Sequence, residues 1–427
     1  MKVSKIGLIS TKLTKLDEQF PVQDMLLQTG QIEQYTSGIY AYGHIPYLLK
    51  KKIDSIICEV LTKYDCSELT LPILQPEKIW IESGRFEKYV SEDTMFTSKT
   101  KYGNFCLAPT AEEAVVAYAR NRLKTYKQLP VTYFQIGQKF RNEIRTRGYL
   151  LRGKVFDMLD AYSFGKNQEE LDYEYDQMKK AYAEIFERLG LSVQPVAADS
   201  GAIGGNVSEE YMSVSNIGED KILFDRNSKK AFNSELLERA DVNEYLLTNY
   251  GIKNTNELEE IRAVELGHIF KLGDKYAKTM NGTFIDNFGE SKNYIMGCYG
   301  IGVSRTLALI YENSKIEKDG KFEGISLPKN LSPYLIYIVP KTDDEQKLTL
   351  AINLYNSLEK EGVNALFDDR SEISIGAKIK DAKVCGTPYL AVIGKSTENG
   401  IIELEETKNG RKIEIKIEDF VNYIKNL

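Results

Sequence analysis

A basic stretch from Arg120 to Lys154 holds the residues whose charge is best suited to chemistry. It contains ten basic side chains and one acid, Glu143, although the whole chain has a net charge of −6. A local positive field of this kind suits a polyanion such as nucleotide phosphates or an RNA backbone, whereas most charge runs are solvated faces. Here the bases alternate with apolar residues as in a strand, which predicts one shared face. The residues on that face would be Lys139, Arg141, Glu143 and Arg145.

The spacing of apolar residues predicts the elements that position this stretch. Helical periodicity predicts one helix over 49–61 and a longer one over 171–189, both packed against a core. Between them, an alternating strand over 67–72 ends in a proline. Beyond residue 333, apolar strands alternate with helical segments, which predicts a mixed sheet covered on both faces. Residues 313–333 are polar, rich in lysine and end in prolines, so they are predicted to form a linker.

The centre of the basic stretch resembles a known motif. Phe140-Arg-Asn-Glu143, a loop and then Arg152-Gly-Lys-Val-Phe156 are similar to motif 2 of the class II aminoacyl-tRNA synthetases, which as a whole would span 131–164. The helix and strand over 48–72 resemble motif 1. The glycine-rich run and helix over 296–312 resemble motif 3.

The resemblance implies the fold and the domain organisation. It implies an α/β protein with a catalytic α+β domain over 1–326, built on an antiparallel sheet. A smaller mixed α/β anticodon-binding domain would follow over 333–427, where Asp368-Asp-Arg370 and Gly386-Thr-Pro388 are similar to the domain that prolyl enzymes share with three other classes.

Three further runs narrow the resemblance to the prolyl-tRNA synthetases. Thr110-Ala-Glu112 is similar to the Thr-x-Glu loop that grips the imino group of proline in that family. The other two runs are Asp157–Phe164 and Glu265-Leu-Gly-His268-Ile-Phe270. A structural interpretation of the first run also stays open, with Thr110 as a helix N-cap and Glu112 in the first turn.

One departure from the family concerns editing. Most bacterial members carry a large editing domain after a strand like the one that holds Gly204 and Gly205. Here roughly fifty residues separate Tyr211 from Arg262, too few to form that domain, with a short amphipathic helix expected near 234–245. The chain resembles the short form, with the editing insertion absent between 211 and 262.

The resemblance also implies a role for each site residue. Arg141 and Arg305 would be catalytic, as guanidinium groups that neutralise phosphate charge while an adenylate forms. ATP would contact Arg141, Glu143, Arg152, Phe156, Glu265, His268 and Arg305. Proline would contact Thr110, Glu112, Arg141, Met158, Asp160, Tyr162, Phe270 and Cys298. Glu265 would ligate Mg²⁺, which needs only one or two protein oxygens when it bridges phosphates.

Composition excludes several other classes of protein. The five cysteines form no CxxC pair and only two histidines are present, His44 and His268, so no zinc is expected. The chain lacks the Gly-x4-Gly-Lys-Ser loop of P-loop NTPases and the Lys-Met-Ser-Lys-Ser-like loop of class I synthetases. Without an apolar run of eighteen residues or a signal-type start, a cytoplasmic protein with no membrane contact is expected.

The expected function is ATP-dependent ligation of L-proline to tRNA(Pro) through a prolyl adenylate, by a homodimer that uses Mg²⁺. Mischarged alanyl-tRNA would be cleared by a separate hydrolase, or its clearance would be dispensed with. The alternative is a non-charging paralogue that binds RNA or adenylates an amino acid for another acceptor. It rests on five departures from the family pattern: Ala111, Thr146, Val155, Leu159 and Glu209. Residues 373–375 depart from the pattern in the second domain.

Overall fold

The computed structural model describes residues 1–9, 13–198, 207–225, 228, 230–234, 237, 240–252 and 258–427. The chain forms two compact units, one over Asp54–Thr306 and one that joins Met1–Ile53 to Leu307–Leu427. Two helices pass between them in sequence, α2 (His44–Lys63) and α9 (Val303–Asn313). The chain passes from one unit to the other after residues 53 and 306. The division into a catalytic domain over 1–326 and an anticodon-binding domain over 333–427 stays a prediction.

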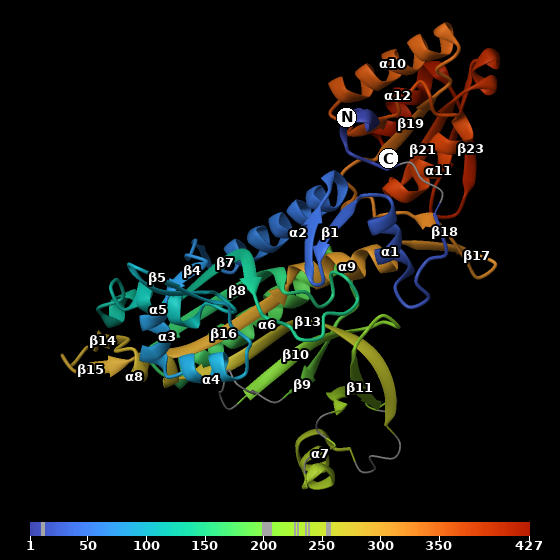
Figure 1. Ribbon diagram of the computed structural model, residues 1–427. Coiled ribbons are helices and arrows are strands. Elements are labelled where there is room, and N and C mark those ends of the chain that lie inside the picture. The colour runs from blue at the N-terminus through green and yellow to red at the C-terminus, as the bar shows by residue number, and fades with distance from the viewer. Residues whose placement is uncertain are drawn as a thin grey trace. The chain divides into compact units, whose positions relative to one another are not determined.

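A nine-stranded sheet organises the unit Asp54–Thr306 (Figure 1). Its strands, in order across the sheet, are β10 (Val207–Val214), β9 (Gln194–Ala197), β12 (Lys230–Asn233), β11 (Asp220–Asp225), β13 (Glu259–Gly273), β16 (Ile295–Gly302), β8 (Val155–Gly165), β7 (Val131–Phe140) and β3 (Ser67–Glu68). Neighbours pair antiparallel except at β3–β7 and β9–β12, and β10 also pairs with β13. The predicted antiparallel catalytic sheet is therefore confirmed.

The long helix α6 (Gln168–Arg188) lies along this sheet, against β8, β13 and β16. Asn167 caps it by accepting a hydrogen bond from the Glu170 N–H. The predicted apolar stripe is buried, from Leu171 to Leu189. Because the ring of Tyr175 lies 6.3 Å from that of Tyr299 on β16, the helix covers the face of the sheet to which Tyr299 points.

The same unit also contains shorter helices and strands, several of which pack against the central strands β8 and β16. They are β4 (Leu74–Pro76), α3 (Glu77–Ser83), α4 (Phe86–Ser91), β5 (Thr97–Thr100), β6 (Gly103–Leu107), α5 (Glu112–Ala119), η2 (Tyr126–Gln128), α8 (Lys275–Thr279), β14 (Thr283–Ile285) and β15 (Ser291–Asn293). Apolar residues of α5 and α8 share one core with Tyr162 and Phe164 of β8. This core fixes the start of α5 against the central strands.

The segment between β10 and β13 differs in detail from its prediction. Instead of a helix near 234–245, the helix is α7 (Val242–Tyr250), which ends at Gly251 with φ 75°. Its apolar residues pack on β11 and β12 through Leu223, Phe232 and Leu246. Gly204 and Gly205 lie outside the described residues.

The second unit is built on a five-stranded mixed sheet, in the order β20 (Ala365–Phe367), β19 (Ile336–Pro340), β21 (Tyr389–Ile393), β22 (Ile401–Glu406), β23 (Arg411–Lys416). The first three strands are parallel and the last two antiparallel. Ile336 and Ile338 pack in a core with α10 (Glu345–Lys360) and α12 (Ile417–Lys425). Tyr337 and Val339 point the other way, into a core with α11 (Ile375–Cys385). The predicted mixed sheet with two covered faces is confirmed.

The start of the chain belongs to this second unit, a feature that the sequence did not indicate. Lys2 bridges to Phe367 at the edge of β20, and Ser4 donates to the Asp369 carboxylate at 2.7 Å. The remaining elements are η1 (Val3–Lys5), α1 (Pro21–Gln28), β1 (Ile32–Thr36), β2 (Ile39–Tyr42) and η5 (Lys395–Asn399).

The predicted linker over 313–333 is wrong in its first half. That part folds into the hairpin of β17 (Lys315–Lys318) and β18 (Lys321–Ile325). At Gly324 a Cβ would lie 2.5 Å from the carbonyl oxygen of Lys383, so only glycine allows β18 to approach α11 this closely. The prediction failed because a lysine-rich hairpin has the same polar composition as a solvated linker, and the sequence does not show that β17 and β18 pair with each other.

In the described part of the chain, no helix has the length and apolar character needed to cross a membrane.

Candidate active site

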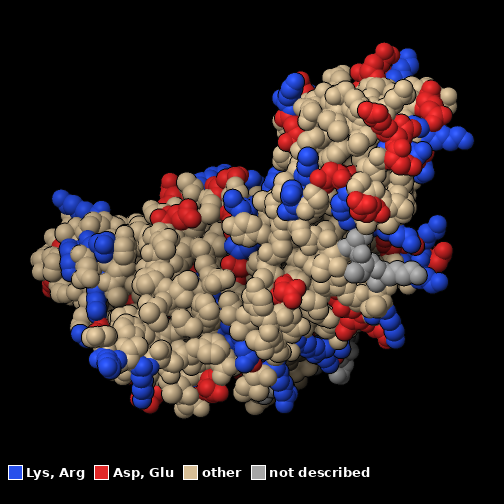
Figure 2. Space-filling model, turned by 45° about the horizontal axis from the view of Figure 1, so that its top comes forward, with Lys and Arg blue, Asp and Glu red and all other residues tan. Residues whose placement is uncertain are grey.

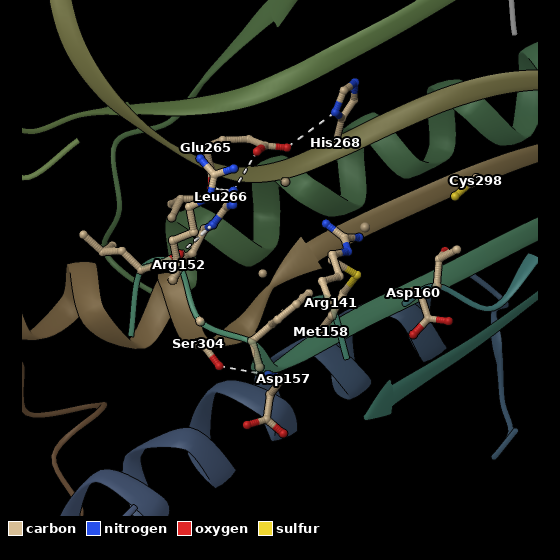
Figure 3. Close-up of a pocket in the computed structure, with 18 of the residues that line it drawn as sticks. Arg141, Arg152, Asp157, Met158, Asp160, Glu265, Leu266, His268, Cys298 and Ser304 are labelled. Atoms are coloured by element: carbon tan, nitrogen blue, oxygen red, sulfur yellow. Dashed lines mark hydrogen bonds and ion pairs between the residues drawn. The ribbon is translucent and has the colours of Figure 1, made fainter. Parts of the chain in front are cut away.

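All fourteen residues predicted for the site line one cavity in the unit Asp54–Thr306, with an empty volume of about 890 Å³ that includes its opening to solvent. In Figure 3, Arg152 and Glu265 lie at one end, Asp160 and Cys298 at the other, and Arg141 and His268 between them. The arrangement offers a long site with two chemically different ends.

Strands β8 and β16 provide the floor of the cavity through their alternation. On β8, Phe156, Met158, Asp160 and Tyr162 all line the cavity, as the period of two requires. On β16 the lining residues are Cys298, Gly300 and Gly302. A Cβ at Gly300 would meet no protein atom closer than 3.8 Å, so the protein does not exclude a side chain there and the bare backbone leaves room for a ligand.

The predicted shared face of Lys139, Arg141, Glu143 and Arg145 is wrong. Strand β7 ends at Phe140, and the Glu143 N–H turns back to the Arg141 carbonyl at 2.7 Å. Of these four residues, only Arg141 and Glu143 line the cavity, and Arg145 is exposed to solvent. Lys139 is buried, with its ammonium 2.5 Å from Asp160 Oδ1. The strand alternation does not continue past Phe140 because the chain leaves the sheet there.

A β-bulge in β13 brings Glu265 and His268 together. Residues three apart on a regular strand point to opposite faces, but the register with β10 passes from Tyr211–Gly267 to Met212–Glu265 and leaves Leu266 without a partner. Both side chains consequently reach the cavity, with His268 Nδ1 3.4 Å from Glu265 Oε1. His268 Nε2 also contacts the Ser208 hydroxyl, so both ring nitrogens are engaged.

At this end of the cavity the arginines are already paired with carboxylates. Arg305, in the first turn of α9, donates to Glu265 Oε2 at 2.6 Å and to the Leu151 carbonyl at 3.0 Å. Burial opposes ionisation, but Arg305 and His268 hold the pKa of Glu265 well below its usual value. Arg152 donates to Glu143 at 3.0 Å and to Glu219 at 3.3 Å. A triphosphate would have to exchange with these carboxylates for the guanidinium groups.

Arg141 sits between the two ends of the cavity. Its Nε donates to the Pro109 carbonyl at 3.2 Å, and its guanidinium carbon lies 5.2 Å from the centre of the Phe156 ring. No described carboxylate pairs with it in the way that Glu265 pairs with Arg305. Arg141 therefore keeps donors directed at a ligand that carries negative charge.

The other end of the cavity is acidic and almost closed to solvent. Glu112 is fully buried; it accepts from Thr110 Oγ1 at 2.6 Å, Arg85 at 3.1 Å and the Cys298 thiol at 3.3 Å. Burial alone would raise the pKa of Glu112, but Arg85 and Thr110 hold it below its usual value. Asp160 accepts from Tyr162 at 3.1 Å. A small ligand with a positive charge fits this end.

The N-cap interpretation of Thr110 is wrong. Helix α5 begins at Glu112 and its N-cap is Ala111, with no side-chain hydrogen bond to the helix backbone. The Thr110 hydroxyl instead donates a hydrogen bond to the Glu112 carboxylate. Glu112 is in the first turn, as that interpretation required.

Arg85 and Glu113 are parts of this end that the sequence did not reveal. Arg85 Nη1 lies 3.1 Å from both Glu112 Oε2 and Glu113 Oε1, and all three side chains are buried. Glu113 also accepts from Ser83 Oγ at 2.8 Å. A polar residue directly after a turn glycine, Gly84, is the one local signal that could have pointed to Arg85.

Several bases of the stretch 120–154 are paired with acidic side chains in the fold. Arg120 pairs with Glu82 at 2.7 Å, and Arg147 lies 3.9 Å from Glu219. On the face shown in Figure 2, basic and acidic side chains are interspersed. Pairing with Glu82, Glu143 and Glu219 therefore weakens the positive field predicted for the whole stretch.

Three side chains around Glu265 are close enough together to hold a cation. Glu210, Glu265 and His268 offer ligand atoms within 4.8 Å of one another. These two carboxylates, of which Glu265 lines the cavity near Arg152 and Arg305, fit Mg²⁺, which prefers oxygen and takes few protein ligands. His268 fits less well as a ligand, since Ser208 and the carboxylates already engage its nitrogens. Glu210 is a second acid that the sequence prediction did not include.

Comparison of the chain with family models and with known proteins identifies the family to which it belongs. A family model described as the tRNA synthetase class II core domain (G, H, P, S and T) matches residues 95–314, and an anticodon binding domain model matches 335–427. A proline–tRNA ligase of Fusobacterium nucleatum is 30% identical over 100% of this chain and 99% of its own. One of Listeria welshimeri is 32% identical over 95% and 96%. The chain belongs to the proline–tRNA ligases, class II synthetases.

Solved structures of this family share the fold. Prolyl-tRNA synthetase of Cryptosporidium parvum, complexed with halofuginone and AMPPNP, has a TM-score of 0.74 at 17% identity, covering 97% of this chain and 80% of that one. The enzyme of Giardia lamblia in complex with prolyl-adenylate also has a TM-score of 0.74, at 18% identity, covering 96% and 76%.

The comparison also shows a difference in length within the proline–tRNA ligases. The alignment with the Fusobacterium protein runs over 571 positions, against 427 residues in this chain, so about 144 positions have no counterpart here. This difference agrees in size with a missing domain.

Proposed function

We propose that this protein attaches L-proline to tRNA(Pro) at the expense of ATP, through a prolyl adenylate. The observation that carries the proposal is the cavity itself, which joins an arginine-lined end to a buried acidic end across Arg141. The relatives that cover 95–100% of the chain are named proline–tRNA ligases. ATP fits the first end and the secondary ammonium of proline the second.

Arg141 and Arg305 take the catalytic roles in this proposal. The carboxylate of proline attacks the α-phosphate, and negative charge builds on the phosphate oxygens as pyrophosphate leaves. Arg141, between the ends, neutralises the α-phosphate, while Arg305 and Arg152 hold the outer phosphates. Groups fixed in advance at a developing charge need no reorganisation during the reaction.

The remaining residues orient the reactants. Phe156 offers a ring for the adenine and Glu143 an acceptor for its amino group. Glu265 and Glu210 would hold Mg²⁺, which would neutralise phosphate charge when bound. Met158, Tyr162 and Phe270 form the apolar wall around the proline ring, with Asp160 behind them.

No side chain needs to act as a nucleophile. Cys298 is the one thiol that lines the cavity, and burial, followed by the Glu112 charge, raises its pKa well above the usual value. A neutral thiol is a poor nucleophile. Cys298 serves as a small wall residue beside the acidic end.

Several features of the proposed function extend beyond the cavity. They are a homodimer, tRNA contacts by residues 333–427, catalysis by residues 1–326 and a cytoplasmic location. The match of the anticodon binding domain model to residues 335–427 supports the second.

The alternative of a non-charging paralogue has no observation in its favour. None of its five departures lines the cavity among the described residues. Leu159 is in the core, and Glu209 pairs with Lys179 at 2.9 Å on the outer part of the sheet. Divergence at these positions leaves the predicted contacts with substrate intact.

Proline-dependent ATP–pyrophosphate exchange tests the proposed function. Exchange should require proline and should be far weaker with threonine, whose hydroxyl and primary ammonium do not match the pocket. Alanine and cysteine, which are small, are the informative competitors. An enzyme that shows no exchange with proline, while binding ATP, would support the paralogue instead.

The short segment between β10 and β13 leads to a prediction about editing. A pocket that accepts proline cannot strongly reject the smaller alanine, because the lost apolar contact is worth only about 1–3 kcal/mol. We expect the purified enzyme to form alanyl-tRNA(Pro) and to leave it intact, so that a separate hydrolase would have to remove it.

The measurement is the decay of labelled alanyl-tRNA(Pro) with enzyme and in buffer alone. Equal decay rates are expected. Faster decay with enzyme would show that the segment 211–262 edits in spite of its length.

A further inference from the structure

The carboxylates of Glu112 and Glu113 share a single guanidinium. Arg85 Nη1 is 3.1 Å from each of them, and the exposed fraction of the three side chains is 5% for Arg85 and 0% for both acids. Two buried carboxylates that face one cation cannot both ionise easily, since the second negative charge has no partner of its own. The cluster therefore has a position where a proton can reside.

The packing around the cluster identifies that position as Glu113. Glu112 has three hydrogen-bond donors, from Thr110, Arg85 and Cys298, and it faces the cavity. Glu113 has Ser83 and Arg85 and lies behind it, away from the cavity lining. In agreement, burial raises the pKa of Glu113 to about 7, helped by the Glu112 charge and opposed by Arg85.

Arg85 is held so that it cannot leave the pair. Its guanidinium carbon lies 5.3 Å from the Trp80 ring, 4.7 Å from the Tyr89 ring and 5.3 Å from the Tyr276 ring. Its Nη2 also contacts the Tyr89 hydroxyl. Among Arg85, Glu112 and Glu113, the charge that can change most easily is therefore that of Glu113, by gain or loss of a proton.

We infer that Arg85 and Glu113 are positioning residues that couple recognition of the substrate ammonium to release of a proton from Glu113. With Glu113 protonated, Arg85 and Glu112 balance to zero net charge. When a cation binds at Thr110 and Glu112, loss of that proton restores one net negative charge against it. The inference rests on the proposed function, in that the cation is the ammonium of proline.

Other titratable groups face the cluster, and their titration has to be distinguished from that of Glu113. Tyr89 of α4, Tyr276 and Lys275 of α8 and Cys106 of β6 interact with it electrostatically. Burial raises the pKa of Cys106 to about 12 and raises those of both tyrosines, so these groups stay neutral near pH 7. Burial lowers the pKa of Lys275 from its usual value, which makes Lys275 the one competing proton donor to test.

The direct test is calorimetric titration of the full-length protein with L-proline alone at pH 7, in buffers of different ionisation enthalpy. The slope of the observed enthalpy gives the protons released. For the wild type we expect on the order of half a proton, since a group with a pKa near 7 is half protonated there. Glu113→Gln should release none. Lys275→Arg, whose charge is fixed, and Glu87→Gln, an exposed acid on α4, should behave as wild type.

The kinetic counterpart is the pH dependence of the KM for proline in pyrophosphate exchange. As pH rises through about 7, the wild-type cluster gains a negative charge and its KM should fall, by on the order of tenfold. In Glu113→Gln the KM should stay at the low-pH value, with the KM for ATP unchanged in both proteins. A purely structural role for Glu113 would shift the KM equally at every pH.

Stability gives a check on folding of the variant. The folded wild type binds more protons than the unfolded chain between pH 4.5 and about 7, so its stability should decline across that window. Glu113→Gln should lack this decline. Proton release by Glu113→Gln equal to the wild type would overturn the inference. Failure of proline to bind the wild type at all would instead overturn the proposed function.

Discussion

Arg141→Ala and Arg305→Ala are each expected to slow proline-dependent ATP–pyrophosphate exchange by about two to three orders of magnitude. The two guanidinium groups lie at the middle and at one end of the cavity, where Arg141 would stabilise charge that develops on the α-phosphate and Arg305 would hold an outer phosphate. The loss should appear mainly in kcat for Arg141→Ala. It should appear in the KM for ATP as well for Arg305→Ala, because an outer phosphate is bound before the reaction.

A nearby control separates this effect from a general loss of positive charge. Arg145 belongs to the same loop but is exposed and does not line the cavity. Arg145→Ala should exchange at the wild-type rate in this assay, which contains no tRNA. Circular dichroism should report the same fold for all three variants. Near-normal exchange by both Arg141→Ala and Arg305→Ala would refute their assignment.

Glu112→Gln is expected to raise the KM for proline roughly 10- to 150-fold and to leave the KM for ATP nearly unchanged. The substitution keeps the shape of the side chain but removes the charge that a secondary ammonium would meet. A hydrogen bond to a charged group contributes about 1.5–3 kcal/mol, which gives this range. Measurement of both KM values in the same exchange assay decides the matter.

Comparison of the KM for proline with the KM for ATP distinguishes a local effect of Glu112→Gln from a general disturbance of the cavity. Glu112 also begins α5 and accepts from Arg85, so its loss could disturb the whole cavity. A disturbed cavity would raise both KM values together. A rise confined to proline places Glu112 at the amino-acid end.

The sequence could predict the part of the site that repeats along a single strand. Met158, Asp160 and Tyr162 are spaced by two on β8, and their common direction follows from that spacing once the strand is recognised. The resemblance to motif 2 placed Arg141 and Phe156 on either side of the hairpin loop. Local pattern was enough because one or two elements hold all of these residues.

The rest of the site depends on contacts between distant segments, which a local pattern does not record. Arg85 reaches Glu112 and Glu113 only because α3, α4 and α8 pack around the start of α5. The basic stretch looked like one field because its partners, such as Glu82 and Glu219, are elsewhere in the chain. The bulge at Leu266 is a property of the pairing with β10, so spacing alone does not show that Glu265 and His268 share a face, and the resemblance to the family supplied that prediction.

The pairing of β10 with β13 also bears on how proteins of this family can change in size. The strands lie side by side from Val207–Lys271 to Val214–Ala263, so the segment between Val214 and Ala263 departs and returns at adjacent positions. For a segment with fixed, neighbouring ends, each doubling of length costs only about 0.6 kcal/mol of closure entropy. A module of almost any length could be gained, lost or spliced in here by recombination, and the catalytic strands would keep their register throughout.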